Sequence, residues 1–299
     1  METKHDVALV LASGGCRGLA HIGAIEVLEQ RGYRITSIAG CSMGSLIAGI
    51  YACGKLQEAK EWFLTIDKKR IFELTDVSVS LNSLVKGQRV IDAIKEFVPD
   101  RNIEDLPIPV SLVASDVIHN KEVVITSGSL FEAIRASISI PMFFRPVEKD
   151  NMLLIDGGVL NALPLNRVQR KEGDLLAAFN ISAPDVLTPE EYERPELPDF
   201  IENWDFVSRL IDKREQESHK VQLSYTSLLS RMTDMMIQNN TVLMNRMIQP
   251  DILAEMPMNA YPTFAFDKAE EIIQKGRTLM TQAIDKYENT TQATKKDCI

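Results

Sequence analysis

The sequence predicts an α/β fold with a mostly parallel central sheet flanked by helices, and two strand–helix pairs near its start carry this prediction. Residues 6–12 (DVALVLA) form an apolar run typical of a fully buried strand. A glycine-rich turn follows at 13–18, and apolar residues then recur at helical spacing over 19–28. A second apolar strand at 35–40 leads into a helix that begins at Ser42. Strands that alternate with helices in this way are typical of a parallel sheet with covered faces.

The rest of the chain adds strands and helices in a less regular order. Apolar runs predict further strands at 109–116, 122–128, 151–158, 174–182 and 250–256. Helical spacing predicts helices at 89–98, 129–140 and 267–287. The second of these should end at Pro141, because proline cannot continue a helix.

We expect one domain over residues 1–299, with its core in 6–182 and a mostly helical extension over 200–287. The stretch at 183–199 is rich in proline and acid and should form an exposed loop. The polar residues 288–299 should form a frayed tail. Core packing is the favoured interpretation, and contact with lipid the alternative, for five methionines of the extension: Met232, Met235, Met236, Met244 and Met247.

The overall charge excludes one class of partner. The 299 residues are 45% hydrophobic and 25% charged, which is ordinary for a globular protein, and their formal net charge is -9. A chain this acidic has no general electrostatic attraction to nucleic acid. A local basic patch could still meet an anionic lipid surface.

The cysteines and the N-terminus favour a cytoplasmic location. The first residues, METKHDVALV, contain no apolar secretion signal before the first strand. Residues 35–54 carry no charge and are numerous enough to span a bilayer, but their glycines and serines favour a buried strand, a turn and a buried helix. Reduced thiols are expected because no CxxC or other metal-ligand spacing occurs among Cys16, Cys41, Cys53 and Cys298.

The first element whose residues could take part in a reaction is SGGCRG, at 13–18. Its small residues allow backbone N–H groups to point at an anion, helped by the positive end of the following helix. A dinucleotide loop is one interpretation, but it requires an acidic residue near the end of the second strand. This chain has Gly40, Cys41 and Ser42 there. An oxyanion hole fits the same loop.

The second element is GCSMG, in which Gly40 and Gly44 flank Ser42. The two glycines allow a sharp turn between strand and helix and leave room around a nucleophilic serine. The helix that follows would direct its positive N-terminus at the hydroxyl group and at a bound oxyanion.

The third element is LLIDGG, in which Asp156 ends an apolar strand and Gly157 and Gly158 make a tight bend. An aspartate that caps a turn is the simple interpretation. The alternative is a carboxylate within reach of Ser42 that acts as its base, with a pKa raised by a partly apolar site. All three elements follow predicted strands, where open α/β sheets place their ligand sites.

Together, and in this order, the three elements resemble the pattern of the patatin-like phospholipase family. That pattern is a glycine-rich loop before an arginine or lysine and a glycine, then G-x-S-x-G, then Asp-Gly-Gly or Asp-Gly-Ala. The surrounding stretches LAHIGAIEVLEQ, RASISIP (135–141) and LLIDGGVLNALPL are also similar to bacterial members. The resemblance covers residues 6–182 and, more loosely, the final helix. It implies a three-layer, patatin-like fold.

The resemblance implies a serine-dependent lipid acyl hydrolase of the phospholipase A, lipase or esterase type, with a Ser42–Asp156 dyad and neither metal nor cofactor. Ser42 would attack the ester, and Asp156 would take its proton and later activate water. The implied partner is a lipid or another acyl ester, with room for a peripheral membrane contact. The oligomeric state is left open.

The resemblance also assigns the glycine loop a role. Backbone amides around Gly14, Gly15 and Cys16 would form the oxyanion hole. Arg17, followed by Gly18, would steady the loop or meet a phosphate headgroup. The chain departs from the family at position 13, where serine replaces the usual glycine, which puts the dihedral angles of the loop and the strength of the oxyanion hole in question.

Three other interpretations stay open. An α/β-hydrolase triad would need a histidine after the acid, where the chain has only His219. A lipid- or acyl-binding protein with little catalysis is consistent with Ser13, and a nucleotide-binding module is the third. His21 is expected to be packed and not a base. Cys16 and Cys41 are expected to be small filling residues.

Overall fold

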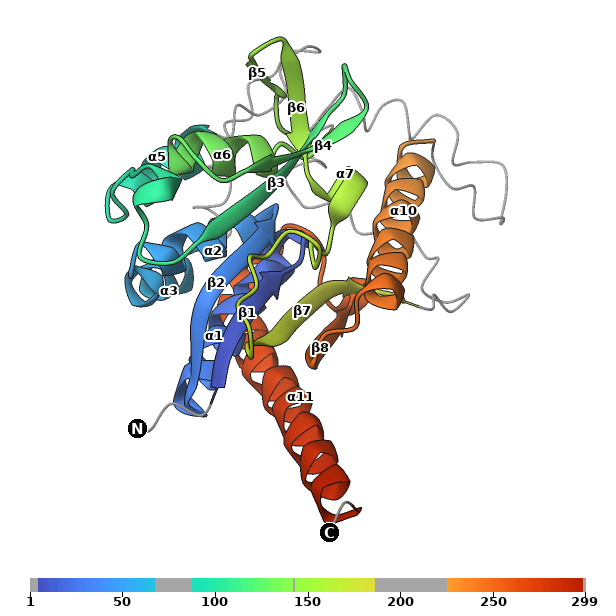
Figure 1. The fold of residues 1–299 in the computed structure, drawn as a ribbon. Coiled ribbons are helices and arrows are strands. Elements are labelled where there is room, and N and C mark those ends of the chain that lie inside the picture. The colour runs from blue at the N-terminus through green and yellow to red at the C-terminus, as the bar shows by residue number, and fades with distance from the viewer. Residues whose placement is uncertain (1–4, 68–87, 142, 186–224, 298–299) are drawn as a thin grey trace.

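The computed structural model describes residues 5–67, 88–141, 143–185 and 225–297, and these ranges contain a mixed, mostly parallel sheet flanked by helices (Figure 1). Five neighbouring strands run parallel: β3 (Val110–Asp116), β2 (Tyr33–Cys41), β1 (His5–Leu11), β7 (Leu175–Ala183) and β8 (Ile252–Pro257). Residues 7–11 of the central β1 are fully buried, because helices cover a parallel sheet on its faces. The α/β prediction is confirmed.

Antiparallel strands extend one end of the sheet. They are β4 (Lys121–Ile125), β5 (Val147–Lys149) and β6 (Met152–Asp156), and the order along the sheet is β5-β6-β3-β2-β1-β7-β8, with β4 also paired to β3. The sequence did not predict β5, because three half-exposed and exposed residues show no periodicity. The antiparallel pairing of β6 with β3 brings Asp156 beside Ala114, in the middle of the sheet.

The helices surround this sheet. Their bounds are α1 (Ala20–Gln30), α2 (Met43–Ala52), α3 (Leu56–Leu64), α5 (Gln88–Lys95), α6 (Leu130–Ser137), α7 (Gly158–Asn161), α10 (Tyr225–Met247) and α11 (Ala269–Asp297). Short 3₁₀ turns lie at Gly15–Leu19, Ile103–Asp105, Met258–Ala260 and Phe266–Lys268. The first strand, its glycine-rich turn, α1, β2 and α2 follow the predicted order. The long α11 packs along α1, whereas α10 packs against α7 and β7 (Figure 1).

The uncharged stretch 35–54 forms β2 and α2, as predicted. Within the described part of the chain, no helix is both long enough and apolar enough to cross a membrane. The predictions for residues 186–224, including most of the acidic loop, the start of the helical extension and His219, lie outside the described residues. Cys298 also lies outside them.

Two sequence predictions are wrong. The polar tail does not fray at residue 288, because α11 continues to Asp297. The start of this stretch is held to the rest of the fold, because Glu288 accepts hydrogen bonds from Arg31 (2.7 Å) and Tyr33 (3.0 Å). The methionines of α10 are mostly not in the core. Met244 packs against the core, but four others are at least half exposed: Met232, Met235, Met236 and Met247.

Candidate active site

Ser42 lies at a strained turn between β2 and α2. Its φ of 53° and ψ of -122° are rare for a residue with a side chain, and such strain is typical of functional sites. The flanking glycines allow close approach of the backbone. A Cβ atom on Gly40 would lie 2.4 Å from the carbonyl oxygen of Gly44, and one on Gly44 would lie 2.2 Å from that of Leu11. The turn has the geometry of a nucleophile elbow.

Asp156 directly contacts this serine. The Ser42 hydroxyl donates to Asp156 Oδ2 over 2.5 Å, although 114 positions separate the two residues in the chain. The other carboxylate oxygen, Oδ1, accepts from the backbone N–H of Gly158 at 2.8 Å. Ser42 is 3% exposed and Asp156 5% exposed, so the pair is almost closed to water. The bend at Gly157 and Gly158 therefore positions the carboxylate as well as ending β6.

The surroundings of Asp156 suit a general base. Burial raises the pKa of Asp156 to about 6, and the hydrogen bonds from Ser42 and Gly158 only partly offset this effect. A carboxylate with that pKa holds a proton more readily than an ordinary aspartate and is still ionised at neutral pH.

His21 is packed, as expected. It is fully buried, its Nε2 lies 2.9 Å from the carbonyl oxygen of Ala12, and its ring meets the edge of Phe179. Burial lowers the pKa of His21 to about 4, so the ring is neutral and donates its Nε2 hydrogen to Ala12. It supports the end of β1, from which the glycine loop starts.

The segment 135–141 (RASISIP) holds both members of the pair. The Ser137 hydroxyl accepts a hydrogen bond from the backbone N–H of Ser42 at 2.9 Å and donates to the carbonyl oxygen of Val113 at 2.6 Å. The carbonyl oxygen of Ser139 accepts from the backbone N–H of Asp156 at 2.9 Å. The sequence singled out this segment only as similar to family members. It gave no role to Ser137, because a buried serine at the end of a helix has no distinguishing pattern.

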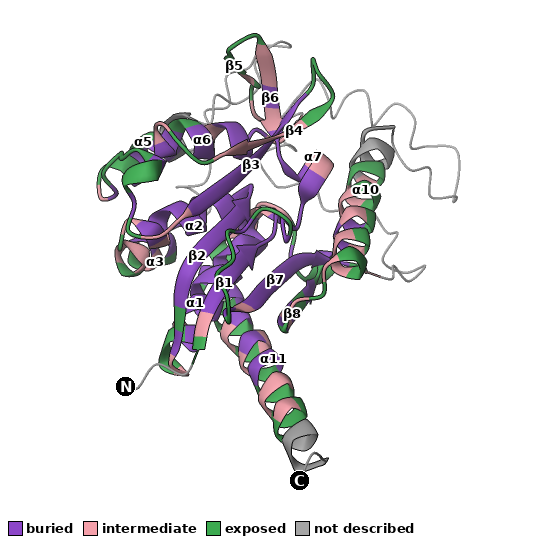
Figure 2. Cartoon of the chain, in the orientation of Figure 1, coloured by how far each residue is buried: buried purple, intermediate pink, exposed green. Residues whose placement is uncertain are grey.

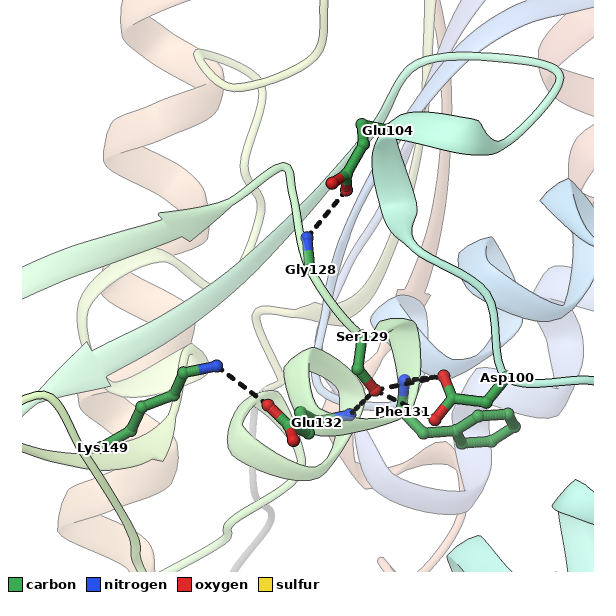
Figure 3. Close-up of polar contacts among 7 residues, drawn as sticks. All are labelled: Asp100, Glu104, Gly128, Ser129, Phe131, Glu132 and Lys149. Carbon is green, nitrogen blue, oxygen red and sulfur yellow. Dashed lines mark hydrogen bonds and ion pairs between the residues drawn. The ribbon is translucent and has the colours of Figure 1, made fainter.

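Capping of α6 fixes the position of Ser137, which ends that helix. Ser129 caps the other end by accepting from the backbone N–H of Glu132 at 3.2 Å. The Asp100 carboxylate accepts from the Ser129 hydroxyl at 3.0 Å and from the backbone N–H of Phe131 at 3.3 Å (Figure 3). Because both ends are tied, the helix can hold the Ser137 hydroxyl against the elbow.

The glycine loop is held by a distant part of the chain. Gly15 has a φ of 57°, which favours glycine, and the following Cys16 donates its backbone N–H to the carbonyl oxygen of Thr263 at 2.9 Å. The Cys16 thiol donates to the carbonyl oxygen of Pro262 at 3.0 Å. The Cys16 amide is therefore already occupied. No described residue accepts from the amides of Gly14 and Gly15.

Arg17 fastens the same loop. It is buried, its Nε donates to the carbonyl oxygen of Ile181 at 3.1 Å, and its Nη1 donates to that of Tyr261 at 2.8 Å. Of the two roles expected for Arg17, this geometry fits the one that steadies the loop. Gly18 leaves space for Met43, whose Cγ would lie 2.2 Å from a Cβ at position 18.

Ser13 fits the loop without backbone strain. It is absent from the described non-glycine residues with positive φ, so its backbone does not require glycine. Its hydroxyl lies against the bend, where a Cβ on Gly158 would come within 2.8 Å of it.

Cys16 and Cys41 are buried, and burial raises the pKa of both thiols, that of Cys16 to about 11. Both cysteines fill space, as expected.

Comparison with known proteins decides the family. The sequence profile of the patatin-like phospholipases matches residues 9–168. The chain belongs to the patatin-like phospholipase family. Uncharacterized NTE family proteins of Mycobacterium bovis and Mycobacterium tuberculosis are 31% identical to it over 94% of this chain and 92% of theirs. Neuropathy target esterase sws of Drosophila melanogaster is 29% identical over 68% of this chain and 14% of its own length.

One solved structure supports the patatin-like fold. VipD from Legionella pneumophila superposes with a TM-score of 0.51 at 15% identity, over 95% of this chain and 67% of its own.

The family match ends at residue 168, but the patatin-like glycine loop is fastened to Ile181 and to residues 261–263. Sequence reasoning missed these anchors because they are backbone carbonyl groups, which any residue type supplies.

Proposed function

We propose that this patatin-like protein hydrolyses acyl esters of lipids, with Ser42 as the nucleophile and Asp156 as the general base. One observation carries the proposal: the 2.5 Å hydrogen bond from the Ser42 hydroxyl to a buried carboxylate whose pKa is raised to about 6. A serine needs such a neighbour, because its own hydroxyl is a weak nucleophile. The names of the family and of one relative, phospholipase and esterase, support the same reaction class.

In the first half-reaction, Ser42 Oγ forms a bond with the ester carbonyl carbon while its proton passes to Asp156 Oδ2. The carbonyl oxygen becomes an oxyanion. When the tetrahedral intermediate collapses, the bond to the leaving alkoxide oxygen breaks, and Asp156 returns the proton to that oxygen. The alcohol departs and the acyl group remains on Ser42.

In the second half-reaction, water replaces the alcohol. Asp156 takes a proton from the water as its oxygen bonds to the acyl carbon, which forms a second oxyanion. Collapse breaks the bond to Ser42 Oγ, and Asp156 protonates that oxygen. The fatty acid is released, and both residues return to their starting states.

We assign the oxyanion hole to the amides of Gly14 and Gly15, aided by the positive end of α2. Both amides are unoccupied among the described residues, whereas that of Cys16 donates to Thr263. Hydrogen bonds from such amides strengthen as charge develops on the oxygen.

The free thiols of Cys16, Cys41 and Cys53 support a reducing compartment such as the cytoplasm.

A substrate panel tests the proposal. Purified protein is incubated with phospholipids, lysophospholipids, triacylglycerols and short water-soluble esters, and released acid is measured, with Ser42→Ala as the control. We expect hydrolysis of at least one lipid class, abolished in the control. Equal hydrolysis by both proteins would contradict the proposal. Loss of turnover in folded His219→Ala protein would support the alternative triad.

A further inference from the structure

The outward side of α10 is mostly apolar, whereas the outward side of a surface helix is usually polar. Its buried residues include Gln238 and Thr241, both polar. Five large apolar side chains, between 49% and 77% exposed, lie on its outward side: Met232, Met235, Met236, Leu243 and Met247. These five residues are named here the methionine face. Figure 2 shows exposed and intermediate segments alternating along α10. An apolar group of this kind marks an interaction surface.

Polar contacts fix α10 beside the active site. The Asn240 side chain donates to the carbonyl oxygen of Leu160 at 2.5 Å and accepts from the backbone N–H of Ala162 at 3.1 Å. Leu160 belongs to α7, which directly follows Asp156 and Gly157, and Ala162 is the residue after the end of that helix. The Thr241 hydroxyl lies 3.4 Å from the carbonyl oxygen of Ser182, at the end of β7. The orientation of the methionine face is therefore fixed relative to the dyad.

The charges around the methionine face favour an anionic surface. Over residues 231–247, the exposed positions include no acidic residue, and Arg246 is the exposed charged residue among them. Asp234 is only half exposed, and Arg231 forms an ion pair with Asp185 at 2.9 Å. Although the net charge of the chain is -9, the exposed described residues of α10 thus carry no acidic side chain. Lipid headgroups of negative charge would not be repelled there.

The size of the methionine face disfavours a second copy of the chain. A stable protein–protein interface takes roughly 20 to 30 residues from each partner. One helix with five apolar side chains offers far fewer. A lipid surface requires no shape complementarity, and flexible methionine side chains adapt to irregular apolar surroundings.

A second group of exposed apolar residues lies on the turn between β3 and β4. Val117 and Ile118, 52% and 61% exposed, form the turn that follows the carboxyl end of β3. The adjoining β4 contacts α7, which in turn contacts α10. The β3–β4 turn and the methionine face are therefore connected through α7, close to the residue that supplies the base.

We propose that the methionine face of α10 docks the protein on an anionic lipid surface and so brings the active site to lipid-embedded esters. The proposal rests on the proposed function, because the lipid of that surface is then the source of the substrate. Docking itself requires no hydrolysis, so the two proposals can fail separately.

Vesicle binding tests the proposal in the Ser42→Ala background, where no lipid is consumed. Co-sedimentation is measured with phosphatidylcholine vesicles that contain phosphatidylglycerol. We expect the triple variant Met232→Gln, Met235→Gln, Met236→Gln to lower the partition coefficient at least tenfold, because glutamine keeps the length and helix propensity of methionine but is polar. Leu64→Gln, a change at an exposed apolar residue of α3, is the matched control and should bind like the parent.

Three further results are decisive. Arg246→Gln should weaken binding to the phosphatidylglycerol vesicles more than to pure phosphatidylcholine vesicles. Equal binding by the triple variant and its parent would overturn the proposal, provided that both unfold at the same temperature. Absence of binding by the parent, or a parent dimer that the triple variant breaks in light scattering, would also overturn it. Hydrolysis of a soluble ester by the unaltered protein, measured separately, reports on the proposed function alone.

Discussion

The two halves of the candidate site are held in different ways. The dyad half, Ser42 and Asp156, is positioned by the segment 135–141, which lies between them in the chain. The loop half, Gly14 to Arg17, is positioned by the end of β7 and by three consecutive carbonyl groups at 261–263. One half is thus fastened from within residues 9–168, and the other from outside them.

We infer from this difference that the C-terminal portion, which supplies the carbonyl groups at 261–263, belongs to the proposed catalytic unit. The connection between β8 and α11 fastens the loop that would receive the oxyanion. Changes on the two halves should therefore separate: changes in the dyad half alter nucleophilic attack, and changes in the loop half alter stabilisation of the oxyanion.

The largest expected effect comes from the dyad itself. Ser42→Ala and Asp156→Asn should each reduce kcat for ester hydrolysis by roughly 10³-fold or more, because the two residues act as one unit. The double variant should be scarcely slower than either single one. Steady-state kinetics on a short ester measure this. Two independent losses that multiply would argue against a dyad.

The next largest effect is expected from a change at Ser137, which supports the dyad half. Ser137→Ala removes the acceptor for the buried Ser42 amide, and we expect kcat to fall about 10- to 100-fold with KM little changed. Ser37→Ala is the matched control, because Ser37 is also buried and also donates to a backbone carbonyl group, that of Gln169. An equal loss of kcat in both variants would reduce Ser137 to a general packing role.

A smaller loss of kcat is expected from a change at Arg17, which supports the loop half. Arg17→Lys keeps the charge but cannot reach both carbonyl groups with a rigid fork, so kcat should fall about tenfold. The loss should be equal for a phospholipid and for a short ester without phosphate. A loss confined to phospholipids would instead assign Arg17 to the headgroup. Arg34→Lys, at an exposed ion pair with Asp6, is the control.

The pH profile reports on the dyad half alone. Because the base must be ionised and burial raises the pKa of Asp156 to about 6, kcat/KM should fall about tenfold per pH unit below that value and level off above it. A midpoint near pH 4, the range of an ordinary carboxyl group, would contradict the buried-base assignment. Arg17→Lys should lower the whole curve without moving its midpoint.

The smallest effect concerns stability. The pKa of Asp156 is raised above its unfolded value of 3.8, so the folded protein binds this proton more tightly, and the resulting stability is lost as the pH rises through about 6. At pH 8 the buried charge costs up to about 3 kcal/mol. Asp156→Asn should therefore raise the free energy of unfolding at pH 8 and lose most of this advantage by about pH 4, close to the unfolded pKa. Thermal unfolding at the two pH values measures it.

Local patterns in the sequence were sufficient to predict the parallel strands and the two residues of the dyad. Continuous apolar runs identified the parallel strands, and short motifs at their ends named Ser42 and Asp156, which the structure brings within 2.5 Å. The order of the strands in the sheet could not be read from the chain, because pairing depends on packing between distant segments.

The supports of the site were hidden for the same reason. Ser137 lies 95 positions from Ser42, and Arg17 lies 244 positions from the carbonyl group of Tyr261. Contacts to backbone groups carry no residue signature. The methionine face was misassigned because apolar residues at helical spacing normally predict burial, and only the surrounding structure shows which side of the helix is covered.

The most direct measurement is covalent labelling with a fluorophosphonate, followed by mass spectrometry of the labelled peptide. We expect a single modified residue, Ser42, and labelling at least 100-fold slower in Asp156→Asn, since the serine then lacks its base. Labelling of a different residue, or labelling of Ser42 at the same rate in Asp156→Asn as in the unaltered protein, would contradict it.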